Sequence, residues 1–271
     1  MPARPLSILS QSSLQDYADC PRRFQLRYLD HLNYPALESE PALENERNQR
    51  EGEYFHRLAQ QALLGLDGDR LARLAHSPDL SRWWQNFLDH RPELDGCTVY
   101  TEFTLTAPLG GLRLVAKYDV IAVRDGAASI YDWKTYRTRP KNEWLAARWQ
   151  TRVYLALLCH SGAFLNAGRV FPAEGLRMFY WFADFPAEPA VITYSAEQFS
   201  RDWDVLRKLA EELPCAPGFP QSEDQQKCGF CTYRSYCDRG TRAAQGFEFE
   251  LQSAPGALFD LNFEQIAEIA F

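Results

Sequence analysis

The sequence lacks the features that mark membrane-spanning, exported or disordered chains. Its longest uninterrupted apolar run, residues 153–159, is far shorter than the roughly 20 residues that cross a bilayer, and no apolar signal segment follows the N-terminus. No internal repeat or low-complexity stretch is visible. With 46% hydrophobic and 14% aromatic residues in 271 positions, the chain can bury a core. We therefore expect a soluble, unexported, cytoplasmic protein with no membrane partner, built as one domain with an insertion or as two small domains.

Positive charge is also scarce. The chain has 29 Lys and Arg against 36 Asp and Glu, a net charge of −7. This balance disfavours a nucleic-acid partner, because phosphate contacts are made chiefly by Lys and Arg. However, residues 245–271 carry five acidic side chains and no Lys or Arg, so the rest of the chain carries only −2. An acidic active site could account for that remainder.

The seven cysteines do not suit a disulfide framework, because their number is odd and no export signal is present. Cys228, Cys231 and Cys237 form a C-x2-C-x5-C cluster that needs a fourth thiolate from elsewhere. Zinc is one interpretation, since C-x2-C is often half of a tetrahedral site, although the other half would need a second close pair. One remote and three clustered thiolates also suit an iron-sulfur cluster. Spacing alone leaves both open.

Hydrophobic periodicity predicts an α/β chain that begins with helices. Ser10 is placed to cap a helix that ends near residue 18, and Pro21 to start a shorter one. The polar residues 33–47 contain two prolines and predict a loop. Apolar spacing of i, i+3, i+4 and i+7 predicts an amphipathic helix over 51–65. Residues 69–90 hold two further short helical patterns, which we interpret as an insertion before the sheet.

From residue 98 the apolar period changes to two, which predicts strands. Residues 98–106, 112–123 and 127–136 are separated by turn sequences and are expected to be consecutive antiparallel neighbours. The expected remainder is a long helix from Pro140 to about His160, an aromatic strand over 176–185, a short strand over 191–194, and a helix from Ser195 to about Leu213.

Three side chains on the second and third strands suggest chemistry. Asp119 is expected to share a face with the alternate, mainly apolar residues of 115–123, where a carboxylate needs a partner. Asp132 and Lys134 share a face at the end of the next strand. If the two strands pair through the turn at Arg124, all three groups converge.

Converging carboxylates repel one another unless a cation neutralises them. Mg²⁺ is suited to this role because it takes hard oxygen ligands and retains waters. The ammonium of Lys134 could orient a metal-bound water and stabilise the charge that develops when a phosphodiester is attacked. Glu102, on the polar face of the first strand, could supply another oxygen. The pattern favours metal-assisted hydrolysis of a phosphodiester.

Each signal also has an ordinary structural alternative. An isolated Asp-x-Lys is more often a solvated ion pair, and a histidine beside an apolar helical stripe, such as His56, more often binds no metal. Gln150 and Tyr154 are spaced i, i+4 on the helix after Lys134, and such a pair alone is more often a packing detail. The signals gain weight only in combination.

In combination, six features resemble the PD-(D/E)XK nucleases of the RecB type. In chain order they are SSLQDYADCPRRFQLRYL, GEYFHRLAQ, KYDVI, YDWKT, the Gln150/Tyr154 pair and CGFCTYRSYC. The sequence is similar to the branch with a 4Fe-4S cluster, which includes the AddB nuclease domain and iron-sulfur CRISPR-associated nucleases. The resemblance extends from about residue 10 to residue 237.

The resemblance implies roles for the proposed active-site residues. Asp119 and Asp132 match the metal-binding acids, Lys134 the catalytic lysine, and His56 the histidine that commonly completes the metal shell. Glu102 remains a further candidate ligand. Gln150 and Tyr154 match the Q-x3-Y motif, which is expected to position DNA or catalytic groups. Cysteines at four positions match the ligands of the 4Fe-4S cluster and would join the N- and C-terminal segments: Cys20, Cys228, Cys231 and Cys237.

The resemblance also implies a fold and a domain plan. A restriction-endonuclease-like mixed β-sheet flanked by helices is expected over residues 1–240. Within it we expect the helical insertion at about 66–92 and the iron-sulfur segment at 214–240. An acidic tail is expected over 241–271.

The function implied is a Mg²⁺- or Mn²⁺-dependent DNA nuclease. The expected mode is an exonuclease on single-stranded or frayed ends in DNA repair or recombination, with Tyr136 or Trp133 available to stack on unpaired bases. The alternative is a noncatalytic DNA-binding module that recruits a helicase or a CRISPR adaptation partner. The sequence has no G-x4-G-K-[ST] motif, so unwinding would come from a partner.

Overall fold

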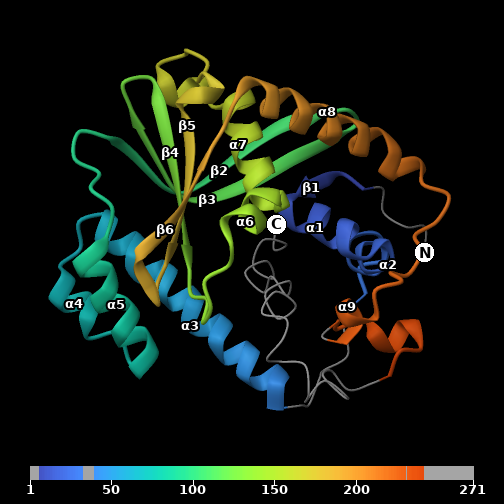
Figure 1. Ribbon diagram of the computed structural model, residues 1–271, viewed down its shortest axis with the longest axis horizontal. Coiled ribbons are helices and arrows are strands. Elements are labelled where there is room, and N and C mark those ends of the chain that lie inside the picture. Colours follow the sequence, from blue (N-terminus) through green and yellow to red (C-terminus); the bar gives the residue numbers. More distant parts are fainter. Residues whose placement is uncertain (1–5, 33–39, 230, 241–271) are drawn as a thin grey trace.

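A mixed sheet of six strands runs through the protein, in a computed structural model that describes residues 6–32, 40–229 and 231–240 (Figure 1). The strands are β1 Ile8–Ser10, β2 Thr98–Leu109, β3 Leu112–Arg124, β4 Ala127–Lys134, β5 Leu176–Phe182 and β6 Phe185–Thr193. Their order is β1-β3-β4-β5-β6, and β2 also pairs with β3. The pairs β2–β3, β3–β4 and β5–β6 are antiparallel, as predicted for the first three strands, whereas β1–β3 and β4–β5 are parallel.

The turn between β3 and β4 fixes the register of the central hairpin. Arg124 pairs with Ala127 across a two-residue turn in which Asp125 and Gly126 both have positive φ, 52° and 79°. Such turns match the twist of antiparallel strands and favour the Asp-Gly sequence. The same register pairs Val120 with Tyr131, where the ladder ends, so Asp119 and Asp132 are the next residues on the two strands.

Helices cover both faces of this sheet (Figure 1). Before β2 lie α1 Gln11–Asp19, α2 Pro21–Phe24, the π-helical turn Gln25–Leu29, α3 Glu40–Leu63, α4 Gly68–Ala72 and α5 Pro78–His90. After β4 lie α6 Asn142–Ala147, α7 Trp149–Ser161, α8 Ala196–Glu212 and α9 Gln225–Gly229, with short 3-10 turns at Ala163–Asn166, Ala173–Gly175, Leu213–Cys215 and Arg234–Cys237. Among the described residues, no helix is long and apolar enough to cross a bilayer.

The core is divided by the sheet. On one face α1, α7 and α8 pack against the strands through residues such as Leu14, Leu157 and Leu206. On the other face α3 and α5 form an aromatic cluster around Phe55 and Trp133. The arrangement confirms the predicted mixed sheet flanked by helices. Trp133 is only 1% exposed inside this cluster, so its expected availability for base stacking was wrong.

Two helix boundaries differ from the sequence predictions. Residues 40–47, expected in a loop, belong to α3. Pro41 does not interrupt this helix, because it falls in the first turn, where no donor N–H is needed. The single long helix expected after Pro140 is two helices, since Arg148 has an extended conformation with φ −65° and ψ 145°. The predicted acidic tail, residues 241–271, lies outside the described residues.

Candidate active site

Three elements bring potential metal ligands together. His56 comes from α3, Glu102 from β2 and Asp119 from β3, and one ligand atom of each lies within 4.8 Å of the others. His56 Nδ1 is 3.4 Å from Asp119 Oδ1, and Lys117 Nζ is 2.6 Å from Glu102 Oε2. A mixed imidazole and carboxylate set of this kind fits a divalent cation.

Glu102 reaches this position through an irregularity in the β2–β3 ladder. Thr101 pairs with Val120 and Phe103 with Tyr118, but Glu102 between them has a φ of +50° and is not paired. A positive φ is uncommon outside glycine and often accompanies function. No feature of the sequence marks this irregularity.

The alternation of β3 changes at the same point. Leu114, Ala116 and Tyr118 face the main core, and beyond Asp119 so do Ile121 and Val123. The prediction that alternate residues of 115–123 share one face was therefore wrong. The period-two pattern cannot reveal such a change, because both faces of this strand carry apolar side chains.

Asp119 is held as a carboxylate. Its Oδ2 accepts a hydrogen bond of 2.8 Å from the Trp133 N–H. Burial by itself raises the pKa of Asp119, but the His56 imidazole, the Trp133 N–H and the charge of Lys134 outweigh burial, and the pKa falls below its usual value. An ionised carboxylate is the form that binds a cation.

Asp132 and Lys134 form a buried pair beside this group. Lys134 Nζ lies 2.9 Å from Asp132 Oδ2, with side-chain exposures of 1% and 3%. Gln150 of α7 donates a 2.6 Å hydrogen bond to Asp132 Oδ1. Asp132 is thus engaged by an amine and an amide, and is not one of the three residues that converge within 4.8 Å.

Tyr154 is hydrogen-bonded to β3. Its hydroxyl donates to the Lys117 carbonyl, and its own carbonyl accepts a 2.9 Å hydrogen bond from the buried Tyr118 hydroxyl. Gln150 and Tyr154 therefore both connect α7 to the sheet, Gln150 through β4 and Tyr154 through β3. These contacts hold α7 against the strands that carry the acids.

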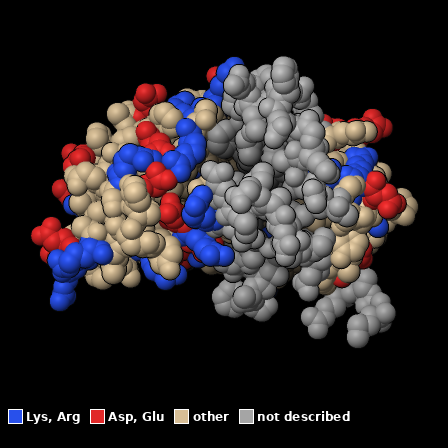
Figure 2. All heavy atoms as spheres, turned by 90° about the horizontal axis from the view of Figure 1, so that it is seen from below, with Lys and Arg blue, Asp and Glu red and all other residues tan. Residues whose placement is uncertain are grey.

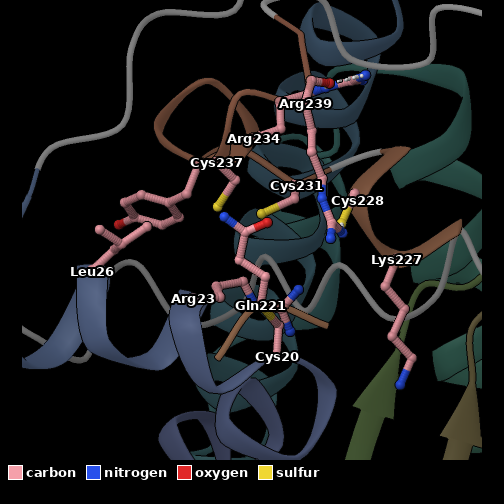
Figure 3. Close-up of a pocket in the computed structure, with 11 residues that line it drawn as sticks. Cys20, Arg23, Leu26, Gln221, Lys227, Cys228, Cys231, Arg234, Cys237 and Arg239 are labelled. Atoms are coloured by element: carbon pink, nitrogen blue, oxygen red, sulfur yellow. Dashed lines mark hydrogen bonds between the residues drawn. The ribbon is translucent and has the colours of Figure 1, made fainter. Parts of the chain in front are cut away.

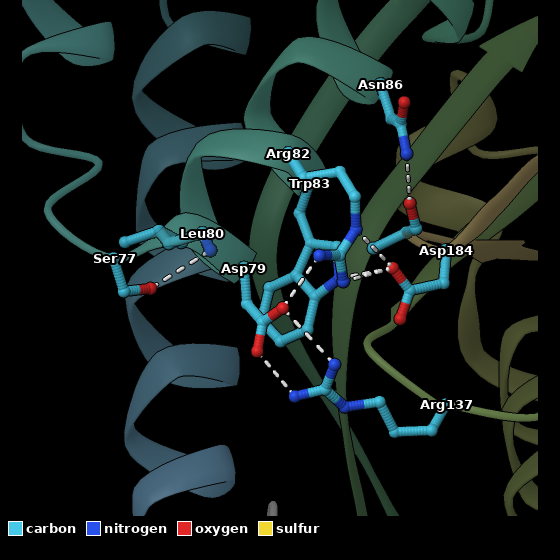
Figure 4. A network of polar contacts seen from close by, with 9 residues as sticks. Ser77, Asp79, Leu80, Arg82, Trp83, Asn86, Arg137 and Asp184 are labelled. Carbon is cyan, nitrogen blue, oxygen red and sulfur yellow. Dashed lines mark hydrogen bonds and ion pairs between the residues drawn. The ribbon is translucent and has the colours of Figure 1, made fainter.

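A charged network fixes the loop after Lys134 (Figure 4). Asp79 of α5 accepts hydrogen bonds from Arg82 and Arg137, and Arg82 also binds Asp184 in the β5–β6 turn at 2.7 Å. Hydrogen bonds from Arg137 and Arg82 lower the pKa of Asp79. Sequence reasoning missed this network, since an acid in the first turn of a helix is explained by the helix dipole alone.

The face shown in Figure 2 carries Lys and Arg interspersed with Asp and Glu on its described part. Arginines near the site follow the same pattern. Arg137 pairs with Asp79, and Arg152 lies 2.6 Å from Asp202. These cations are neutralised by neighbouring acids, which agrees with the small net charge of the chain outside 245–271.

The four cysteines predicted as ligands line one pocket (Figure 3). Cys20 lies between α1 and α2, whereas Cys228, Cys231 and Cys237 come from the C-terminal segment. Burial raises the pKa of Cys231, and the nearby charge of Arg23 opposes it. Among the described residues, no three of these sulfur atoms lie within 4.8 Å of one another.

Basic side chains surround this pocket. Arg239 Nη1 lies 2.8 Å from Cys228 Sγ. Arg23, which is buried, lines the pocket and pairs with Asp16 at 2.8 Å and Asp19 at 3.0 Å. The sequence motif identifies the cysteines, but these arginines carry no comparable signal.

Comparisons with known proteins identify the family of this chain and similar folds. Residues 8–238 match the family described as the PD-(D/E)XK nuclease superfamily, and no curated protein matches the chain. A protein from Eubacterium rectale, described as a putative exonuclease, is 13% identical with a TM-score of 0.50, covering 85% of this chain and 88% of that one. The structure of SSO0001 is 13% identical with a TM-score of 0.43, covering 86% of this chain and 87% of that one. At 13% identity, the likeness to the first structure concerns the fold.

Proposed function

Because the chain belongs to the PD-(D/E)XK nuclease superfamily, we propose that it is a Mg²⁺- or Mn²⁺-dependent DNA nuclease. We further propose that it acts as an exonuclease on single-stranded or frayed ends during DNA repair or recombination. The observation that carries the catalytic part is the convergence of His56, Glu102 and Asp119 beside the Asp132–Lys134 pair.

The residues divide the work between binding and charge stabilisation. His56, Glu102 and Asp119 would hold the cation, with Asp132 as a further ligand, and a bound cation supplies an activated water. Lys134 is buried, and its ammonium would stabilise the negative charge that develops on the attacked phosphate. Gln150 orients Asp132 through its hydrogen bond to Oδ1.

We propose a 4Fe-4S cluster held by Cys20, Cys228, Cys231 and Cys237. The thiol set fits, because four cysteines line one pocket and positive side chains face it. One remote and three clustered cysteines support the cluster over zinc, because a tetrahedral zinc site more often combines two close pairs of ligands.

The cluster would join residues 214–240 to the N-terminal segment within a nuclease domain of residues 1–240. Residues 66–92 form its helical insertion in this proposal, and 241–271 its acidic tail. A cytoplasmic location fits this assignment, because thiols remain reduced there.

Cleavage of end-labelled single-stranded DNA, duplex DNA and RNA by anaerobically purified protein tests the proposal. We compare Lys134→Met and Asp119→Asn with the control Lys208→Met, which alters an exposed lysine on α8. Loss of the Lys134 ammonium, which would stabilise the transition state, or of the Asp119 carboxylate, which would hold the cation, should lower kcat at least about 100-fold, and the control should keep its activity. Circular dichroism checks the fold, iron and sulfide analysis the cluster, and the product ladder the polarity.

Two outcomes would overturn parts of this proposal. If the unaltered protein binds DNA and contains iron but cuts none of the substrates, it is a noncatalytic module that recruits a helicase or a CRISPR adaptation partner. If it contains zinc in place of iron and sulfide, the cluster assignment is wrong while the nuclease assignment stands or falls on cleavage.

A further inference from the structure

The first residues of α7 are held by a side chain from another helix. The residue before the helix, Arg148, makes no capping hydrogen bond through its side chain. Instead, Gln15 Oε1 of α1 accepts a hydrogen bond of 3.4 Å from the N–H of Trp149, the first residue of α7. The first N–H groups of a helix have no partner within the helix, so a side chain that accepts from one of them stabilises the position of the helix start.

The start of α7 is also where the helix meets the proposed active site. Gln150 follows Trp149 directly, and its amide donates to Asp132 at 2.6 Å. Asp132 in turn lies 2.9 Å from Lys134 Nζ. A shift of the first turn of α7 would therefore move Gln150 and change the position of the Asp132–Lys134 pair.

The nitrogen of the same Gln15 amide connects α7 to the cysteine pocket through hydrogen bonds. Gln15 Nε2 donates to Asp19 Oδ1 at 3.1 Å. Asp19 immediately precedes Cys20 and also binds two side chains that line the pocket, Arg23 at 3.0 Å and Lys227 at 3.3 Å. One polar chain thus runs from the cysteine pocket to the acids, and Gln15 is its middle member.

We propose that Gln15 is a positioning residue that couples the cysteine pocket to the active site by holding the start of α7. This inference rests on the proposed nuclease function. It assigns Gln15 no contact with substrate or metal. Its substitution should therefore lower the rate of the chemical step and leave substrate binding unchanged.

The test compares kcat and KM for Mg²⁺-dependent cleavage of end-labelled single-stranded DNA by the full-length, anaerobically purified protein. Gln15→Leu removes both hydrogen bonds, Gln15→Glu keeps an acceptor for the Trp149 N–H, and Gln198→Leu on α8 is the matched control. Since one hydrogen bond is worth about a 2- to 13-fold change in an equilibrium or rate constant, Gln15→Leu should lower kcat by a factor in about this range. KM and iron content should stay within about twofold, and Gln15→Glu should recover part of the loss.

Hydrogen exchange at the Trp149 amide gives a readout that does not need activity. It should be faster in Gln15→Leu than in the unaltered protein and unchanged in Gln198→Leu. An unchanged kcat in Gln15→Leu, with active unaltered protein, would overturn the proposal. If the unaltered protein does not cleave, the nuclease function itself fails, and unchanged exchange at Trp149 would then overturn the positioning role separately.

Discussion

The buried Asp132–Lys134 pair permits a sharp prediction for stability. Lys134→Met replaces the ammonium with an apolar group of similar length and leaves the Asp132 carboxylate with its hydrogen bond from Gln150 but without its cation. Removing one partner of a buried pair costs about 3–5 kcal/mol, because the remaining charge stays desolvated. We therefore expect Lys134→Met to lower the free energy of unfolding by about this amount near neutral pH.

This loss should depend on pH in a defined direction. Without Lys134, protonation of Asp132 would remove the buried charge, and burial favours the neutral form of a carboxyl group. The destabilisation should therefore be larger at neutral pH than in acid, where the folded variant can take up a proton.

The second variant, Asp132→Asn/Lys134→Met, removes both charges. Asparagine keeps an oxygen that can accept from Gln150, so the double variant should lose only about 1–2 kcal/mol. Urea unfolding under anaerobic conditions, followed by tryptophan fluorescence at two pH values, gives the free energy of unfolding of the unaltered protein, of Lys134→Met and of the double variant. A double variant as unstable as Lys134→Met, or a Lys134→Met variant as stable as the unaltered protein, would refute this reasoning.

Three further predictions concern other parts of the molecule. Because the pKa of Asp119 is lowered in the folded state, its carboxylate stabilises the fold at neutral pH, and the stability difference from Asp119→Asn should shrink below about pH 4, as urea midpoints across pH would measure. Asp79→Asn should cost under about 1 kcal/mol, since its partners are exposed, but should speed tryptic cleavage after Arg137 in a gel assay. A Cβ at Gly162 would lie 2.5 Å from the Leu158 carbonyl oxygen, so Gly162→Ala should cost about 1–3 kcal/mol in thermal unfolding, whereas Gly218→Ala, with open space around it, should not.

Local signals were enough to predict the elements that carry the site. The alternation in β2 to β4 and the Asp125-Gly126 turn predicted the two hairpins, and the turn length sets the register that ends at Val120–Tyr131, next to Asp119 and Asp132. The helical stripe beside His56 predicted the second half of α3. Each of these features depends on neighbours within a few residues, which a single sequence displays directly.

The remaining features depend on contacts between distant residues. Nothing local in the sequence marks the positive φ of Glu102 or the extended Arg148 between α6 and α7. The hydrogen bond between Gln15 and Trp149 joins residues 134 positions apart. Charged pairs such as Arg137–Asp79 are equally invisible, since most charged side chains are compatible with solvent.

The two-residue turn between β3 and β4 also limits which insertions and deletions this hairpin can accept. Side chains alternate along β4, so Asp132 and Lys134 lie on one face while Trp133 packs into the aromatic cluster on the other. Inserting or deleting one residue within β4 would exchange these faces, placing an indole among the acids and two charges in the aromatic cluster. Changes in length at this hairpin should therefore be tolerated far less than changes in the segment between α4 and α5, which a deletion scan scored by cleavage would reveal.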